Sequence, residues 1–375
     1  MNFPRFFPLL IALVLMPAPL LASVVPNLYS ASVPVNSQSE QARSQALQGA
    51  LRQVIVKVTG SRAAPDNPQV AAIVAQPEQY LQAYRYQRHV PAPNEPLFGP
   101  NASATLDLWA QFDSQTLNQA LRAAGQPLWG SERPATLVWI AYEQGDGQRN
   151  IVGAEAADAV LQSVQQAAKA RGVPVMFPLM DVQDRAHLSF SDVWGGFVAP
   201  VVQASQRYQP DAILIGRIDG SGIAANARWT LVVAGQPTSW DGAHGKPSEV
   251  ASAAIQHLAD LYASRFVIKT GAGAQQIPAL DIMVSHIGDL GAYGRVLKYL
   301  RSLSAVDNVE PMQITGDAVT FKVSAQGTIA DLEQTIALGS VLETSNETMP
   351  VPPPEANSSV TPIAVPLTLH YRYQP

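Results

Sequence analysis

The residues best suited to bind a metal ion are Asp181, Asp184 and His187, which fall within one short polar segment. Carboxylate oxygens and imidazole nitrogens are common ligands of divalent cations. The same three side chains would also suit a solvated turn between a strand and a helix. A fixed third or fourth ligand, as zinc sites require, does not emerge from the spacing. We therefore predict no metal site and no cofactor.

Acid–base chemistry has one local candidate, Asp241 with His244 in a glycine-rich turn. Serine, histidine and aspartate residues are available for a catalytic triad, but their spacing selects no three of them. The chain contains neither a nucleophile elbow nor a phosphate-binding loop. The Gly271–Gly273 segment lacks the third glycine of a dinucleotide fingerprint and follows a helical pattern where that motif needs a strand. These patterns favour a protein that is not an enzyme.

The alternative is an envelope hydrolase or a small-ligand binder. Its site would be a cleft beside the C-terminal ends of the central strands, near Asp181 and Asp219.

Tryptophans give a second kind of candidate site. Trp129 and Arg133 lie where the sequence pattern changes between two domains, and a tryptophan beside a linker packs an interdomain contact more often than it stacks on a ligand. We predict that Trp129 packs at this boundary and that Arg133 supports it with a smaller contribution. Trp139 and Trp194 are further candidates for interdomain or interaction contacts.

The first 23 residues have the order of a secretory signal peptide. One basic residue, Arg5, precedes an apolar run that proline interrupts and that is too short to span a bilayer comfortably. Small residues follow it. We predict cleavage after Ala22 or Ser23, export to the periplasm, and no stable membrane insertion after the signal is removed.

Composition supports this assignment. The net charge of −5 becomes −6 when Arg5 is removed with the leader, which argues against a general nucleic-acid role. The chain has no cysteine, so an exported version without disulfides points to a bacterial envelope more than to a eukaryotic secreted module.

Hydrophobic periodicity divides the mature chain into three domains. Residues 24–125 predict a small α+β domain, in which Ser39 to Val58 carries one apolar helical face and Gly60 ends the helix. Residues 126–268 predict an α/β domain with a mixed sheet between helices. Its buried strands are Thr136 to Tyr142 and Asp211 to Ile218, and a helix is expected from Ser191 to Tyr208.

A linker at 269–276 precedes the third predicted domain, residues 277–375. Its β-α-β-β-α pattern is one strand short of a ferredoxin-like fold. Pro366 to Tyr373 alternates apolar and polar residues, so we predict that it supplies the missing strand. The proline- and serine-rich residues 344–362 predict a disordered insert.

Three stretches carry a resemblance to a known family: GQPLWGSERPATLVW from Gly125, VWGGF from Val193 and ASQRYQPDAILIGRI from Ala204. With residues 56–60, they are similar to a proteobacterial family of exported proteins catalogued as domain of unknown function 2066. That family has no assigned activity, so the resemblance implies no catalytic residues. At the level of topology, the central domain resembles small α/β domains of envelope assembly factors. These include the N-terminal domain of the Tol-Pal propeller protein and the outer-membrane activators of peptidoglycan synthases.

Taken together, the sequence predicts a non-enzymatic periplasmic protein of three small domains that binds other, unidentified envelope proteins. Several small α+β units in series present surfaces to partners more often than deep pockets.

Overall fold

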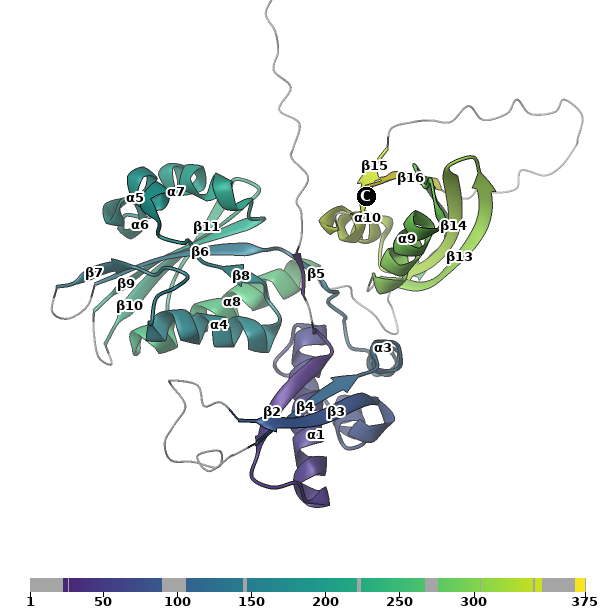
Figure 1. Ribbon diagram of the computed structural model, residues 1–375, viewed down its shortest axis with the longest axis horizontal. Helices are drawn as coiled ribbons and strands as arrows, with labels where there is room; N and C mark the ends of the chain where they lie inside the picture. The colour runs from purple at the N-terminus through teal and green to yellow at the C-terminus, as the bar shows by residue number, and fades with distance from the viewer. Residues whose placement is uncertain are drawn as a thin grey trace, which may run out of the picture.

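The computed structural model describes residues 23–25, 27–89, 106–143, 147–220, 224–266, 276–303, 305–339, 341–345 and 368–374. Figure 1 shows them as three units around a short strand, β5 (Glu132–Arg133). The chain is a mixed α and β protein of several domains, as the sequence predicts. The leader up to residue 22 and the predicted linker at 269–275 lie outside the described residues.

The N-terminal unit is a three-stranded antiparallel sheet, ordered β2-β4-β3, with helices packed on one face. A two-residue strand, β1 (Ser23–Val24), precedes it and pairs with β5. The elements of the unit are β2 (Ser30–Val35), α1 (Glu40–Thr59), α2 (Pro68–Val74), β3 (Leu81–Arg88), β4 (Leu106–Phe112) and α3 (Ser114–Ala123), with short 3-10 turns at Ala64–Asp66 and Pro77–Gln79.

Helix α1 forms where its capping residues predict. The Ser39 hydroxyl accepts a hydrogen bond from the Ala42 N–H at 3.2 Å, and Gly60 ends the helix with φ of 70°, a left-handed conformation that glycine adopts without strain. Its apolar face is buried against the sheet through Leu47, Leu51, Val54, Ile55 and Val58.

The central unit is a mixed sheet ordered β11-β10-β9-β6-β7, with β8 paired to the start of β6. Strands β6 and β9 are parallel, and β10 and β11 continue the sheet in antiparallel fashion. The elements are β6 (Thr136–Glu143), β7 (Arg149–Ile151), α4 (Ala159–Arg171), β8 (Val175–Met176), α5 (Val182–His187), α6 (Phe190–Trp194), α7 (Val198–Ser205), β9 (Ala212–Asp219), β10 (Asn226–Val233), β11 (Gln236–Asp241) and α8 (Pro247–Phe266).

Both faces of this sheet are covered. Helices α4 and α8 lie on one side and α5, α6 and α7 on the other (Figure 1). Along β6, Val138 and Ile140 belong to the core beneath α4 and α8, whereas Leu137 and Trp139 belong to the core beneath α6 and α7. A strand buried on both faces needs apolar residues at every position, which is why β6 reads as an unbroken apolar run.

Helical continuity was overestimated in this unit. The helix predicted from Ser191 to Tyr208 is broken into α6, α7 and a 3-10 turn at Gln206–Tyr208. The break follows α6, where Gly196 has φ of 66° and so leaves the helical conformation. Helix α4 begins at Ala159, because the Asp158 carboxylate accepts the Val160 N–H and caps it there. Strand β7 and helix α5 were not predicted.

The third unit is a five-stranded sheet ordered β13-β14-β12-β16-β15. Its two helices lie on one face of the sheet (Figure 1). The elements are β12 (Gln276–Ser285), α9 (Leu290–Ser302), β13 (Val306–Thr315), β14 (Ala318–Gln326), α10 (Ile329–Leu338), β15 (Leu342–Thr344) and β16 (Thr368–Tyr373).

The last strand completes the ferredoxin-like pattern, as predicted from its two-residue periodicity. Strand β16 pairs parallel with β12 and antiparallel with β15, a short strand that was not predicted. Two boundaries therefore need correction. Gln276 belongs to β12 and not to the linker, and Thr344 pairs with Tyr371 and does not begin the insert. The remainder of the predicted insert, from residue 346, lies outside the described residues.

Within the described ranges, no helix is both long enough and apolar enough to cross a bilayer.

Candidate functional site

The Asp181 and Asp184 carboxylates are both engaged by Arg207. The Arg207 Nη1 atom lies 2.8 Å from Asp181 Oδ1 and 3.0 Å from Asp184 Oδ1. The Tyr208 hydroxyl donates to Asp184 Oδ2 at 2.6 Å. The hydrogen bond from Arg207 is the main reason that the pKa of Asp181 is held well below its usual range. His187 points elsewhere, with Nδ1 2.8 Å from the Gln183 carbonyl.

This cluster joins α5 to the turn after α7, and its negative charges are already balanced. Asp181 also caps α5 by accepting the Asp184 N–H at 2.9 Å. In the part of the chain that the structure describes, no group of three or more histidine, aspartate or glutamate side chains could hold a metal ion.

The second sequence candidate, Asp241 with His244, lines a cavity of about 360 Å³. Asp219 lines the same cavity, so the structure brings together two features that the sequence considered separately. Arg217 and Arg228 also line it, and Arg228 lies 3.9 Å from Asp241. Asp181 is not among the described residues that line this cavity.

Arg133 is fully buried where the N-terminal and central units meet. Its guanidinium donates five hydrogen bonds of 2.7–3.1 Å, and every acceptor is a backbone carbonyl. The acceptors belong to Gly130, Trp129, Lys57, Arg171 and Gly172. Burial lowers the pKa of Arg133 to about 9, so the guanidinium stays charged at neutral pH.

Trp129 packs against this guanidinium, with the Arg133 Cζ atom 3.8 Å from the centre of the ring. The indole is 1% exposed and belongs to the core of the central unit, where it contacts Tyr262 edge to face. Its backbone N–H donates to the Val58 carbonyl of α1 at 2.7 Å. Trp129 therefore contacts both units through different parts of the same residue.

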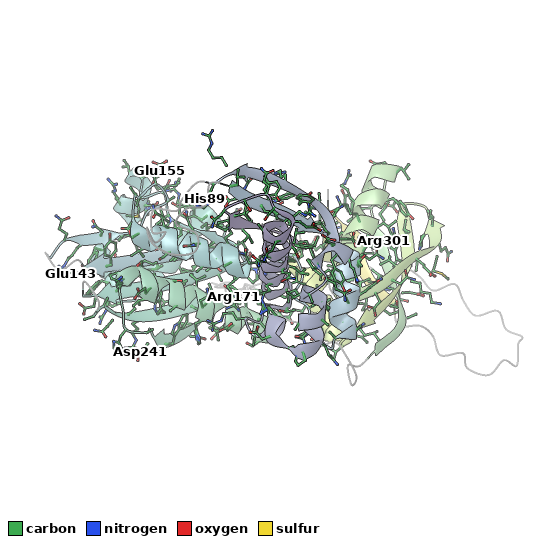
Figure 2. All side chains as sticks on the ribbon, turned by 90° about the horizontal axis from the view of Figure 1, so that it is seen from below. His89, Glu143, Glu155, Arg171, Asp241 and Arg301 are labelled. Atoms are coloured by element: carbon green, nitrogen blue, oxygen red, sulfur yellow. The ribbon has the colours of Figure 1, made fainter. Side chains whose placement is uncertain are left out.

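Arg171 forms a second buried contact between the same two units. Its Nη2 atom donates to the Gly60 carbonyl at 2.7 Å and to Asp260 Oδ1 at 2.6 Å, and its Nη1 atom donates to Gln256 of α8. The residue is 1% exposed. Figure 2 places Arg171 at the boundary between the central unit and the N-terminal unit.

The acceptors of both arginines lie at helix ends. Lys57 and Gly60 end α1, whereas Arg171 and Gly172 end α4. The last carbonyls of a helix have no partner within it and carry partial negative charge. Two guanidiniums satisfy these carbonyls in both helices at once. The N-terminal and central units are therefore held in one relative orientation.

The other two sequence candidates lie within the central unit. Trp139 is fully buried in β6, and its Nε1 atom donates to the Ser205 hydroxyl of α7 at 2.9 Å. Trp194 is half-buried in α6, stacks on Phe190 and faces the Arg217 guanidinium, whose Cζ atom lies 5.2 Å from the ring centre.

Glu132 is a buried acid at the point where all three units come together. Its backbone pairs with Val24 of β1, and its charge contributes to the raised pKa of Tyr299 in the third unit. Close by, Arg122 of the N-terminal unit forms an ion pair with Asp307 of the third unit at 3.0 Å. Burial raises the pKa of Glu132 from 4.5 to about 7.

This raised pKa predicts a pH-dependent stability. Below pH 4.5 Glu132 is protonated in both the folded and unfolded states. As the pH rises to about 7 the unfolded state ionises first, so the free energy of unfolding should fall over that window, by about 3 kcal/mol. Glu132→Gln should remove this slope. Asp211, whose pKa burial raises to about 6, adds a slope of the same sign, so the two proteins are compared by difference in urea titrations. Parallel curves for the two proteins would contradict the prediction.

A cleft of about 460 Å³ opens beside the Arg133 junction. We call it the junction cleft. One wall is the N-terminal sheet and the other is the end of α4 with the turn that follows. The polar and aromatic side chains that define it are Asn27, Ser30, Ser32, Lys57, Arg85, Gln87, Trp109 and Lys169.

Cationic groups dominate the junction cleft. The Arg85 Cζ atom lies 4.1 Å from the Trp109 ring centre, which holds the guanidinium over the indole. The Lys57 ammonium donates to the Ser30 carbonyl at 2.5 Å. Burial, followed by the charges of Arg133 and Lys169, lowers the pKa of Lys57 to about 8. Among the described residues that line the cleft, none carries a carboxylate.

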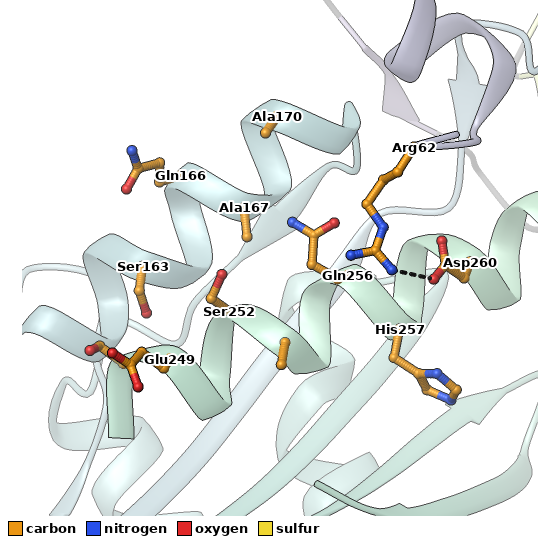
Figure 3. Close-up of a pocket in the computed structure, with 12 residues that line it drawn as sticks. Arg62, Ser163, Gln166, Ala167, Ala170, Glu249, Ser252, Gln256, His257 and Asp260 are labelled. Carbon is orange, nitrogen blue, oxygen red and sulfur yellow. Dashed lines mark ion pairs between the residues drawn. The ribbon is translucent and has the colours of Figure 1, made fainter. Parts of the chain in front are cut away.

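A larger groove of about 630 Å³ runs between α4 and α8 (Figure 3). Its charges, unlike those of the junction cleft, are balanced. Asp260 lies between Arg62 at 3.5 Å and Arg171 at 2.6 Å, and Glu249 lies 3.8 Å from Lys246. Small side chains such as Ser163 and Ser252 line much of the rest.

Sequence reasoning missed the junction cleft, although Trp109 carried a signal. In β4 the apolar face is Leu106, Leu108, Ala110 and Phe112, so Trp109 falls on the polar face with Asp107 and Gln111. An aromatic residue on the polar face of a half-buried strand is a candidate for a binding surface.

Residues 22–130 match the family described as "Domain of unknown function (DUF8605)", so the chain contains a domain of unknown function. This match corrects the predicted resemblance to family 2066. Two of the stretches that carried that resemblance, at 193–197 and 204–218, lie outside the matched residues. They are glycine breaks and a buried strand, which packing imposes on many unrelated α/β units.

No curated protein matches this chain. Among solved structures, the C-terminal domain of LpoB from Salmonella enterica is 18% identical over 34% of this chain and 92% of its own, with a TM-score of 0.21. The competence damage-inducible protein A from Klebsiella pneumoniae is 14% identical over 40% of this chain and 94% of its own, with a TM-score of 0.21. TM-scores this low show no common fold for the whole chain, and no property of these proteins is transferred.

Proposed function

We propose that this chain is an exported, non-enzymatic binding protein of the bacterial envelope, which acts as an adapter for other envelope proteins. The junction cleft is the observation that carries this function. It combines an aromatic ring, an amide and several cationic side chains, which are groups that hold a ligand.

The construction of the cleft favours binding. Its two walls come from different units, and Arg133 and Arg171 fix those units through buried hydrogen bonds. A surface that is already in its binding conformation loses less conformational entropy when a partner binds. Export is supported by the leader, in which Arg5 and a proline-interrupted apolar run precede Ala22 and Ser23.

Site-specific photocrosslinking in intact cells tests this function. A photoreactive amino acid at Gln87, an exposed position in the junction cleft, is expected to give a discrete crosslinked species that contains another envelope protein. The matched control position is Lys298, exposed on α9 of the third unit and distant from the cleft in the fold. It should not give the same species.

Fractionation of the same cells is the control for location. The mature chain should begin near Val24 and be recovered in the periplasm. Crosslinks of equal yield at both positions, or recovery in the membrane with Met1 retained, would contradict the proposed function.

A further inference from the structure

We infer that the junction cleft binds an acidic, extended segment of a partner protein through the carboxylates of that segment. This inference rests on the proposed binding function and adds the chemistry of the ligand. Three observations carry it: the sign of the charges that line the cleft, the burial of one of them, and their distribution over separate elements.

The sign of the charge is opposite to that of the whole chain. Lys57, Arg85 and Lys169 line the cleft, and no carboxylate is found among its described lining residues. The chain as a whole carries a net charge of −5. A local concentration of positive charge on a net-acidic protein attracts negatively charged ligands and steers them to that place.

Burial makes this charge costly in the free protein. The Lys57 residue is 8% exposed, and its ammonium is held by the Ser30 and Asn27 carbonyls. The Arg133 guanidinium behind it is bonded to carbonyls alone. Two buried cations thus lie close together, and a ligand carboxylate would supply the opposite charge that both lack.

The distribution of the cations favours an extended chain over a single small anion. Lys57 is on α1 and is anchored at Ser30 of β2, whereas Arg85 is on β3, two strands further across the sheet, about 10 Å away. Lys169 is on α4, in the opposite wall. Several carboxylates along a peptide can meet these groups together. Gln87 adds a side-chain amide that can pair with the peptide backbone.

Binding of fluorescein-labelled hexaglutamate, followed by fluorescence anisotropy on the full-length mature protein, tests the inference. The wild-type protein should bind hexaglutamate and should not bind labelled hexaglutamine. The double variant Arg85→Gln/Lys169→Gln should weaken binding at least ten-fold. Both side chains are exposed, so this variant is expected to fold. The matched control is Arg228→Gln/Lys298→Gln, which removes the same charge outside the cleft and should change the affinity less than two-fold.

The remaining arms separate the explanations. An equal loss in the control variant would show general charge attraction and overturn the inference. Inorganic phosphate that binds the cleft as tightly as hexaglutamate would identify a small anion as the ligand and would also overturn it. If Gln87 crosslinks to an envelope protein in cells while hexaglutamate fails to bind, the proposed function holds and the acidic-peptide inference is wrong. If hexaglutamate binds and cells give no specific crosslink, the reverse is true.

Discussion

Replacing Arg133 by methionine is expected to lower the free energy of unfolding by about 4 kcal/mol or more. Methionine fills most of the volume but donates no hydrogen bond, so the five carbonyls that Arg133 satisfies lose a partner. Each buried polar group left without a partner costs about 1–3 kcal/mol. Two of these carbonyls, on Lys57 and Gly172, end helices of different units, so the orientation of the units should loosen as well.

Three further variants calibrate this result in urea titrations followed by tryptophan fluorescence. Arg133→Lys keeps the charge but not the planar set of donors, so an intermediate loss is expected. Trp129→Ala should cost about 3 kcal/mol, the usual loss for a buried aromatic residue. Arg85→Met, at an exposed arginine, should change the stability by less than about 0.5 kcal/mol. A smaller loss for Arg133→Met than for Trp129→Ala would contradict the predicted order.

That order is opposite to the one expected from the sequence, and the reason is physical. A tryptophan at a domain boundary announces its burial by its residue type alone. The value of an arginine depends on what its donors meet, and here they meet carbonyls on α1 and α4, which are far apart in the chain. Sequence periodicity describes each helix but not how the ends of two helices are placed.

Local features were predicted well for the same reason. Ser39 and Gly60 define both ends of α1, and the apolar run from Thr136 marks a strand buried on both faces. These signals act within a few residues. The break after α6 shows the limit, because Gly195 and Gly196 interrupt an otherwise good helical pattern that was read as continuous.

The junction cleft was less accessible to sequence reasoning. Trp109 could have been identified, since it interrupts the polar face of β4. Lys57 follows the apolar face of α1 and could be taken for an ordinary cation at a helix C-terminus. Only the packing of the N-terminal sheet against the end of α4 brings Lys57, Arg85 and Lys169 into one cleft.

A chain that ends at Thr361, and so lacks β16, is expected to lose the folded third unit. Strand β16 lies inside the sheet, paired to β12 on one side and to β15 on the other. Its removal leaves the edge of β12 without a partner and takes Tyr371 and Tyr373 from the core. Unpaired strand edges beside exposed apolar surface favour aggregation. We therefore expect poor solubility and rapid hydrogen exchange in β12 and β14.

Point variants within β16 make the same test without truncation. Tyr371→Ala removes a side chain that is 3% exposed and should lower the stability of the third unit by about 3 kcal/mol. Arg372→Ala, at an adjacent exposed residue paired with Glu343, should cost less than about 1 kcal/mol. All six tryptophans precede this unit in the chain, so hydrogen exchange is the better measurement and tryptophan fluorescence should change little. Equal protection of β12 in both variants, or a soluble truncated chain that melts like the full one, would show that β16 does not hold this sheet together.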